Sequence, residues 1–276
     1  KAVDILILSP YSTEEEIPRI LQGGFLATVD SPECAVLLSG VAKRLGVTAR
    51  VHLKFDCGFG RFGFLCEDAA KAAQSIRFLD NLTVCGVYSH MGKCKKEKQA
   101  KTQCKRFMDA VQTLRREGVD CGLVHLASTY NALCYPFLRL NMVRMGEGLS
   151  GRLSGRDRWG FKRVGRLVSE VCDVRWIPAG HPIGEEGKKR RRATKVAVAP
   201  VGSADGLLME RDRRPGLFSK PKWGCEITGE DLPVIGKPGY TTTLIDVTGT
   251  DCAAGDAVSF DISPRFVSPF LRRDYV

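Results

Sequence analysis

The sequence has no apolar run that approaches the roughly 20 residues required by a membrane-spanning helix. It also lacks the charged n-region, apolar h-region and cleavage site of a signal peptide. Its hydrophobic content of 43% and charged content of 26% are typical of a globular protein. The first residue is Lys1 rather than Met, and an apolar, strand-like run follows at once. We expect a globular protein without a membrane partner, and we expect this chain to be a piece of a longer one.

Cysteine patterns that bind metals are also missing. There are 11 cysteines, an odd number, and no Cys-x-x-Cys pair or Cys/His cluster has the spacing of a zinc site. Several, such as Cys85, Cys104 and Cys172, lie in apolar periodic runs, where a free thiol behaves as a small hydrophobe. This usage is typical of a reducing compartment. We expect a cytoplasmic protein with no structural metal.

Acidic residues are too few to balance the basic ones. The formal net charge is +11 and the isoelectric point about 9.2. The excess is concentrated in runs that span residues 93–105, 152–166 and 188–192. None of these runs alternates with aromatic residues, as a surface for stacking bases would. We expect solvated or phosphate-facing edges, and we do not expect nucleic acid as a partner.

Strand and helix signals alternate strictly through the first half. The predicted strands span residues 4–9, 26–29, 49–55, 83–88, 123–127 and 142–145, and helices are predicted between them, among them 67–79 and 95–117. One helix has Pro32 just inside its start and Gly46 just past its end, the usual asymmetry of helix termini. Such alternation indicates parallel strands joined by crossover helices, and therefore a barrel or a doubly wound sheet.

The pattern changes past about residue 161. Apolar runs at 167–176, 195–200, 244–247 and 257–260 are separated by Gly/Pro turns, without convincing helices. The predicted fold class is therefore α/β plus β. We expect an incomplete TIM-type βα barrel over residues 1–162, followed by a mostly β domain over 163–276.

Chemically useful side chains follow the predicted parallel strands. Residues 52–64 read HLKFDCGFGRFGF, so that Asp56 ends a buried strand and a loop rich in glycine then presents Arg61. Later strands end in the same manner, at Ser89-His90, at Ser128-Thr129 and at Arg144, which Gly146 follows. In a βα barrel, ligands bind at this rim, and phosphate favours the loops after the final strands.

Each of these residues also has a structural interpretation. His90 alone is more often a hydrogen-bonded core histidine, and Arg144 can pair with a buried acid. Thr129 and the Gly146 amide are suitable phosphate donors because both present a hydrogen near a helix start. Together, two arginines and a histidine in one mouth are typical of a site for a planar anionic cofactor.

These motifs resemble those of the alanine racemase family, whose members are fold type III enzymes that use pyridoxal 5'-phosphate (PLP). Residues 52–64 are similar to the family's HLK-D-G-GR-GF segment, 88–90 to its THF strand end, 125–129 to HxANS and 142–146 to MVRxG. Residues 178–180 fit its PG turn, 200–206 match P-GYADG and 235–247 resemble GR-MDQ-VDV. The similarity runs through essentially the whole chain in the family's order.

The resemblance implies a set of residues that bind the cofactor. Arg61 would hold the PLP phenolic oxygen and the substrate carboxylate, and Lys54, which is carbamylated in some members, would orient Arg61. His90 would lie against the pyridine ring. The phosphate would be bound by Thr129, in place of the family's serine, and by Gly146.

The resemblance also assigns a role to Arg144, at the end of the last predicted barrel strand. Arg144 would donate to the pyridine nitrogen and keep it unprotonated, which makes PLP a weaker electron sink and favours racemisation over side reactions.

Two catalytic groups of the family have no counterpart in this chain. The Schiff-base lysine follows the first barrel strand, in a segment that we expect to be absent here. The base of the second face is the tyrosine of GYADG, where this chain has Ser203. A serine hydroxyl is too weak an acid and too short for that role. Tyr240, which falls in the family's MDQ substrate segment, and Glu185 are possible replacements.

Two functions therefore stay open. The resemblance implies PLP-dependent racemisation of L-alanine and D-alanine, or of a related amino acid, for D-alanine biosynthesis by a cytoplasmic homodimer whose site is shared across subunits. The alternative is a non-catalytic relative that binds PLP or a similar anion, or a decayed fragment without activity.

Overall fold

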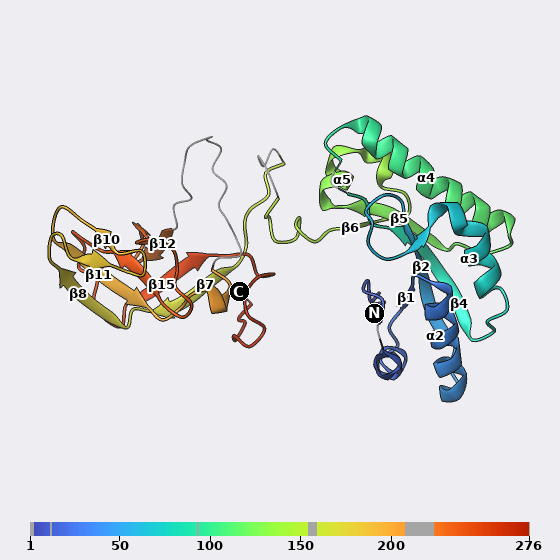
Figure 1. Cartoon of the computed structure of the whole chain (residues 1–276), viewed down its shortest axis with the longest axis horizontal. Coiled ribbons are helices and arrows are strands. Elements are labelled where there is room, and N and C mark those ends of the chain that lie inside the picture. The colour runs from blue at the N-terminus through green and yellow to red at the C-terminus, as the bar shows by residue number, and fades with distance from the viewer. Residues whose placement is uncertain (1–2, 12, 93, 154–158, 208–223, 276) are drawn as a thin grey trace. The chain divides into compact units, whose positions relative to one another are not determined.

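The computed structural model describes residues 3–11, 13–92, 94–153, 159–207 and 224–275. Lys93 and part of the basic run 152–166 thus lie outside the described residues. The chain divides into two compact units, Lys1–Gly146 and Glu147–Val276, which Figure 1 shows at the blue-to-green and yellow-to-red ends of the chain. Each unit is described by itself.

Unit 1 is built on a parallel sheet. Its strand order is β1 (Ala27–Val29), β2 (Ala49–Asp56), β4 (Leu82–Ser89), β5 (Leu123–Ser128) and β6 (Met142–Arg144), with the short β3 (Phe64–Leu65) paired to the end of β2. Every neighbouring pair is parallel. The predicted alternation is therefore confirmed. All carboxyl ends lie at one edge of the sheet.

The predicted strand at 4–9 forms only in part. Leu6 makes a single parallel bridge to Leu26, supported by a hydrogen bond from the Ile7 N–H to the Leu26 carbonyl at 2.9 Å. The segment lies beside β1, although it does not continue as a regular strand. Among the described residues, the backbone-to-backbone hydrogen bonds of this segment all join it to Leu26 in the chain that leads into β1.

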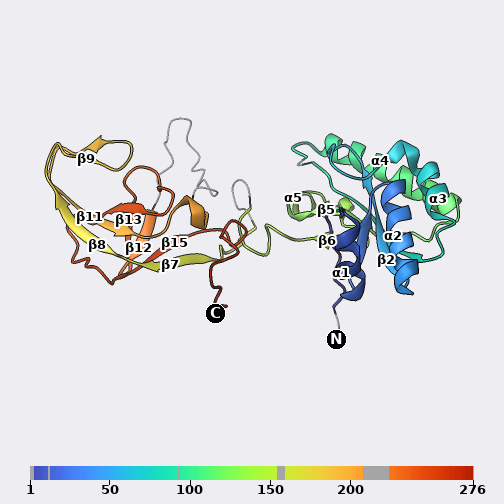
Figure 2. The same ribbon diagram turned by 60° about the horizontal axis from the view of Figure 1, so that its bottom comes forward.

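The helices connect successive strands. They are α1 (Ile17–Gln22), α2 (Pro32–Leu45), α3 (Ala69–Ile76), α4 (Glu97–Arg116) and α5 (Thr129–Cys134), with 3-10 turns at Glu14–Glu16, Cys66–Asp68 and Pro136–Leu138. Figures 1 and 2 show α2, α3 and α4 in one layer against the sheet. The predicted helices 67–79 and 95–117 are shorter at both ends, because a 3-10 turn precedes α3 and α4 starts at Glu97.

The ends of α2 follow the sequence signals. The Ser31 Oγ accepts a hydrogen bond from the Cys34 N–H at 3.1 Å, which caps the first turn. Gly46 closes the helix with φ of 67°, in the left-handed region.

The sheet has an apolar face and a polar face. Along β2, Val51, Leu53 and Phe55 belong to the core cluster of unit 1. Side chains alternate along a strand, so the buried His52 and Lys54 lie on the opposite face. This inner face carries the polar side chains of the site.

Unit 2 is antiparallel. One sheet has the order β14 (Thr243–Asp246), β11 (Thr194–Ala199) and β8 (Asp173–Ile177), and another the order β13 (Glu230–Pro233), β12 (Gly224–Ile227), β15 (Ala257–Asp261) and β7 (Arg166–Glu170). A hairpin of β9 (Pro182–Ile183) and β10 (Lys188–Lys189) carries the basic run 188–192. The prediction of a single strand at 167–176 is wrong, because Val171 and Cys172 separate β7 from β8 and the two strands pair in different sheets. Ala197, Ile227, Ile245 and Val258 lie at the centre of this unit's core.

Two glycines between α4 and β5 allow a matched test of packing. A Cβ on Gly122, at φ +49, would lie 2.2 Å from the Cys85 carbonyl oxygen, whereas one on Gly118, at φ +83, would meet nothing within 4 Å. We predict that Gly118→Ala costs about 1–2 kcal/mol of stability for the left-handed conformation alone, and that Gly122→Ala costs clearly more. Urea unfolding measures both. Equal losses would contradict the close approach of Gly122 to β4.

Candidate functional site

The loop after β2 is organised by one carboxylate. The Asp56 Oδ1 accepts from the N–H groups of Gly58 and Phe59 at 2.7 and 2.8 Å, and its Oδ2 accepts from Gly60 and Arg61 at 2.6 and 3.0 Å. Burial acts to raise the pKa of Asp56, but the four N–H donors outweigh it and the pKa is lowered. The carboxylate therefore stays ionised and fixes the backbone that carries Arg61.

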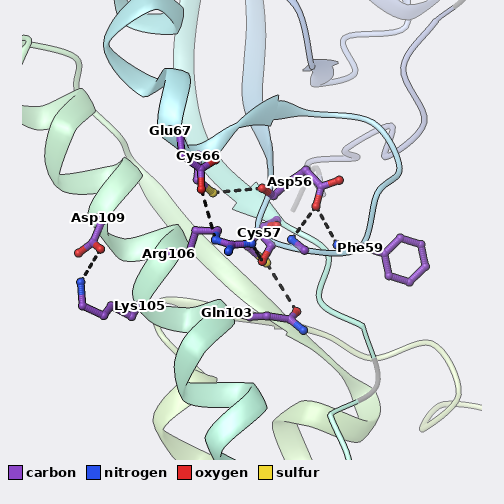
Figure 3. Close-up of polar contacts among 11 residues, drawn as sticks. Asp56, Cys57, Phe59, Cys66, Glu67, Gln103, Lys105, Arg106 and Asp109 are labelled. Carbon is purple, nitrogen blue, oxygen red and sulfur yellow. Dashed lines mark hydrogen bonds and ion pairs between the residues drawn. The ribbon is translucent and has the colours of Figure 1, made fainter.

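A second set of contacts ties this loop to α4. Arg106 donates to the Cys57 carbonyl at 3.5 Å and forms an ion pair with Glu67 at 3.4 Å, as Figure 3 shows. From the other side, the Cys66 thiol donates to the Asp56 carbonyl at 3.2 Å. The loop is thus held by a helix, by the following turn and by its own acid.

Phe59 brings Arg61 and His90 to one place. The Arg61 guanidinium carbon lies 4.6 Å from the Phe59 ring centroid, and the His90 ring meets the same ring edge-on at 5.1 Å. Burial lowers the pKa of His90 to about 4, with further lowering by Arg144, Arg61 and Lys54. His90 is therefore neutral at pH 7, and Arg144, Arg61 and Lys54 lie within electrostatic range of it.

A chain of hydrogen bonds crosses the inner face from β6 to β2. Arg144 Nη1 lies 2.7 Å from His125 Nδ1, and His125 Nε2 lies 2.9 Å from His52 Nδ1. A guanidinium only donates, so His125 accepts at Nδ1 and donates from Nε2 to His52. Burial, followed by nearby arginines, lowers the pKa of His52 to about 4 and that of His125 to about 3. Both imidazoles are neutral.

Arg144 is held without an acid. Its Nη2 donates to the carbonyls of Ser89 at 2.7 Å and Leu126 at 3.1 Å. Among the described residues no carboxylate forms an ion pair with it, and its Nε makes no hydrogen bond. The alternative that Arg144 pairs with a buried acid is therefore wrong. Its positive charge stays uncompensated at the end of β6.

Tyr88 fills the centre of the inner face. Its ring stacks on His125 with centroids 4.9 Å apart and an interplanar angle of 5°. Its hydroxyl lies 2.9 Å from Thr28 Oγ1 and donates to the Leu8 carbonyl at 3.0 Å. Burial raises the pKa of Tyr88 to about 12, so the phenol is neutral and positions the imidazoles by packing.

Lys54 is buried beside this ring. The residue is 4% exposed, and its Nζ lies 5.6 Å from the Tyr88 ring centroid and 5.0 Å from that of Phe62. Burial, followed by Arg61, lowers the pKa of Lys54. The Arg144 guanidinium carbon lies 5.3 Å from the centroid of the same Tyr88 ring.

The two predicted phosphate donors are in contact with each other. The Gly146 N–H donates to Thr129 Oγ1 at 3.1 Å, and Thr129, at the start of α5, is buried. The structure therefore joins the end of β6 to the turn after β5. Both groups carry a hydrogen, so each is of the type that donates to an anionic oxygen.

The remaining two candidate residues lie in unit 2. The Ser203 N–H donates to the Gly239 carbonyl at 2.8 Å, and the Ala204 N–H donates to the Tyr240 carbonyl at 2.9 Å. Ser203 starts a short 3-10 turn (Ser203–Asp205), and Tyr240 is 74% exposed. The structure brings these two segments together.

Several residues of the site were missed by sequence reasoning. The motifs alone assign no role to four residues that position Arg144 and Arg61, namely His52, Tyr88, His125 and Phe59. One signal is visible in β2, where His52 and Lys54 alternate with Val51, Leu53 and Phe55. Polar residues at a period of two in a buried strand indicate a polar inner face.

The site thus defines a class of protein, namely a βα domain that concentrates cations and hydrogen-bond donors at the carboxyl ends of its strands. A comparison with known families narrows this class. The family model described as alanine racemase, N-terminal domain, matches residues 1–153. This chain belongs to the alanine racemase family.

Individual relatives agree with this assignment. The chain is 30% identical to an alanine racemase of Methanococcus maripaludis over 266 residues, which cover 92% of this chain and 68% of that protein. Among solved structures, an alanine racemase of Clostridium difficile 630 matches with a TM-score of 0.79 at 23% identity, covering 94% of this chain and 67% of the other. One from Bacillus anthracis with bound L-Ala-P matches with a TM-score of 0.75 at 20% identity, covering 97% and 69%.

These likenesses confirm the predicted fold class and family. The family depends on PLP. Among the described residues, no helix is long and apolar enough to cross a membrane, and no group of three His, Cys, Asp or Glu could hold a metal ion.

The buried imidazoles predict a pH dependence of stability. His52, His90 and His125 have folded pKa values below the usual 6.5, so the unfolded chain binds more protons as the pH falls. Stability is therefore complete above about pH 6.5 and is lost progressively towards pH 4, at about 1.4 kcal/mol per pH unit and imidazole. Urea unfolding at pH 7 and pH 5 measures this. His52→Gln should flatten the dependence, and the exposed His181→Gln should not. An identical slope in all three chains would contradict the arrangement.

The close approach of β4 to His52 gives a second prediction. A Cβ on Gly86 would lie 2.3 Å from His52 Cε1, so Gly86→Ala should displace the imidazole from His125 and cost about 1–3 kcal/mol. Gly40→Ala in α2 meets only Arg44 Nη1 at 3.8 Å and should be neutral or slightly stabilising. Imidazole nitrogen NMR shifts and urea unfolding provide the readouts. Unchanged imidazole signals in the Gly86 variant would refute the packing.

Proposed function

We propose that this chain binds PLP in the mouth formed by the ends of β2, β4, β5 and β6, and that it is part of a racemase interconverting L-alanine and D-alanine. The observation that carries the proposal is Arg144. Its two terminal nitrogens are bound to carbonyls and to a neutral imidazole, which leaves Nε as a donor.

The residues of the mouth fit this cofactor. Arg144 Nε would donate to the pyridine nitrogen and hold it unprotonated, because a guanidinium does not release its proton. Thr129 and Gly146 would bind the phosphate. Arg61, fixed through Asp56, would hold the phenolic oxygen and the substrate carboxylate, and His90 would pack against the ring.

When bound, PLP supplies a conjugated ring that stabilises charge developing at the substrate α-carbon. The residues of this chain limit that effect. Arg144 is oriented by His125, Ser89 and Leu126, and in that position it would keep the ring nitrogen uncharged and weaken the electron sink. A weakened sink favours proton exchange at the α-carbon over reactions that need a long-lived carbanion.

A second function is supported by Ser203. We infer that this position, where the family has its tyrosine base, is poorly suited to proton transfer, since a serine hydroxyl is a weak acid. A non-catalytic relative that binds PLP or a similar anion is therefore the alternative. Exposed Tyr240, in the segment adjacent to Ser203, is the candidate replacement for the base.

The assembly proposed for the racemase is a homodimer in the cytoplasm, with the second domain of one subunit contributing to the site of the other. The family resemblance supports this assembly. Circular dichroism follows L-alanine racemisation by the PLP-loaded chain. Conversion in either direction supports the racemase and contradicts the non-catalytic alternative, whereas saturable PLP binding without conversion is expected of both, because this chain lacks counterparts of two catalytic groups.

The phosphate site allows a specific test. We predict that Thr129→Val, which removes the hydroxyl but preserves shape, weakens PLP binding about tenfold or more, because a hydrogen bond to a charged group contributes about 1.5–3 kcal/mol. Binding of pyridoxal, which has no phosphate, should change little. Thr102→Val, on the exposed face of α4, is the matched control. Equal losses for PLP and pyridoxal would contradict the assignment of Thr129 to the phosphate.

A further inference from the structure

The amine of Lys54 is buried without an acceptor. The residue is 4% exposed, and within the part of the chain that the structure describes its Nζ makes no hydrogen bond or ion pair, only contacts with the rings of Phe62 and Tyr88. Burying an unpaired charge costs far more than burying a neutral amine. Burial therefore raises the fraction of the free amine, which is the nucleophilic form of lysine.

The charges around Lys54 act in the same direction. Arg61 and Arg144 oppose its protonation, while Asp30 and Asp56 favour it. Asp56 is occupied, because both of its oxygens accept hydrogen bonds from the loop backbone. Burial is the largest influence, and the net result is a lowered pKa for Lys54.

The amine is also in the right place. Lys54 Nζ and the Arg144 guanidinium carbon lie 5.6 and 5.3 Å from the centroid of the same Tyr88 ring. Phe62, the other ring in contact with Nζ, is the neighbour of Arg61 in the loop after β2. Lys54 therefore lies inside the set of groups assigned to the pyridine nitrogen and the phenolic oxygen of PLP.

We propose that Lys54 captures the aldehyde carbon of PLP in this chain by forming a covalent imine. The proposal rests on the proposed function, because Arg144, Arg61 and Thr129 bring the aldehyde into the mouth. It goes beyond the positioning of Arg61 that the family resemblance assigns to Lys54.

The chemistry needs no oxidant or further reactant. The Nζ lone pair adds to the aldehyde carbon, and one amine proton passes to the former carbonyl oxygen. The second amine proton leaves with that hydroxyl as water, and a carbon–nitrogen double bond remains. Only a free amine reacts, so a carbamate on Nζ would block the step.

Trapping by borohydride tests the proposal directly. The 276-residue chain is incubated with an equimolar amount of PLP in CO₂-free buffer and reduced, which converts the imine to a stable secondary amine. Peptide mass spectrometry then locates the phosphopyridoxyl group, and equilibrium dialysis measures PLP binding in parallel. We expect most of the label on Lys54, and at least a tenfold loss of label at this site when bicarbonate is present in excess.

Two variants separate the possible outcomes. Lys54→Arg has no primary amine, so it should lose the label at this position, and equilibrium dialysis measures the PLP binding that it retains. Lys71→Arg, at an exposed lysine of α3, should keep the label on Lys54. Saturable binding without label on Lys54, or label spread equally over exposed lysines in all three chains, would overturn this inference alone. The absence of saturable binding in the parent chain would overturn the proposed function as well.

Discussion

Uncompensated positive charge on the inner face of the parallel sheet is the constraint on which the site depends. Arg144 lies there at the end of β6, Arg61 lies in the exposed loop after β2, and neither arginine is paired with a carboxylate among the described residues. Asp56 contributes a negative charge, but both of its carboxylate oxygens accept hydrogen bonds from the backbone of its own loop. Like charges in one mouth oppose folding unless an anion enters. An anionic ligand would therefore stabilise the fold as it binds.

Neutral groups make this arrangement possible. His125 accepts from Arg144 and donates to His52, and Tyr88 stacks on His125 without ionising. A protonated imidazole at either position would add a further charge and set two hydrogen-bond donors against each other, because an imidazolium donates from both of its nitrogens. The polar network and the apolar face of β2 are thus two sides of the same strand, one packing against helices and the other orienting cations.

The sequence allowed the parallel alternation, the change to a β domain and the family to be predicted, because each depends on local patterns. Strand ends such as Ser89-His90 and Arg144 were recognisable because a polar residue follows an apolar run. The side chains that these residues contact in the fold could not be predicted from such local patterns. The contact of His52 with His125 joins residues 73 positions apart, and the stack of Tyr88 on His125 depends on the register of β4 against β5. The break between β7 and β8 was missed because no glycine or proline marks it in the sequence.

Sequence motifs near strand ends and side-chain contacts in the folded chain therefore carry different information. Glycines and acids near a strand end predict that a loop presents a side chain, whereas three-dimensional pairing decides which charges are compensated. The buried amine of Lys54 illustrates the difference, since its motif gives its identity and only its surroundings reveal that it lacks an acceptor.

A crystal structure of the chain grown with PLP would test most directly whether the uncompensated charge forms an anion site. We predict electron density for the cofactor in the mouth bounded by Arg61, Arg144 and Thr129, with the phosphate beside Thr129 and Gly146. Cofactor density away from the carboxyl ends of β2, β4, β5 and β6, or an empty mouth in a crystal saturated with PLP, would contradict it.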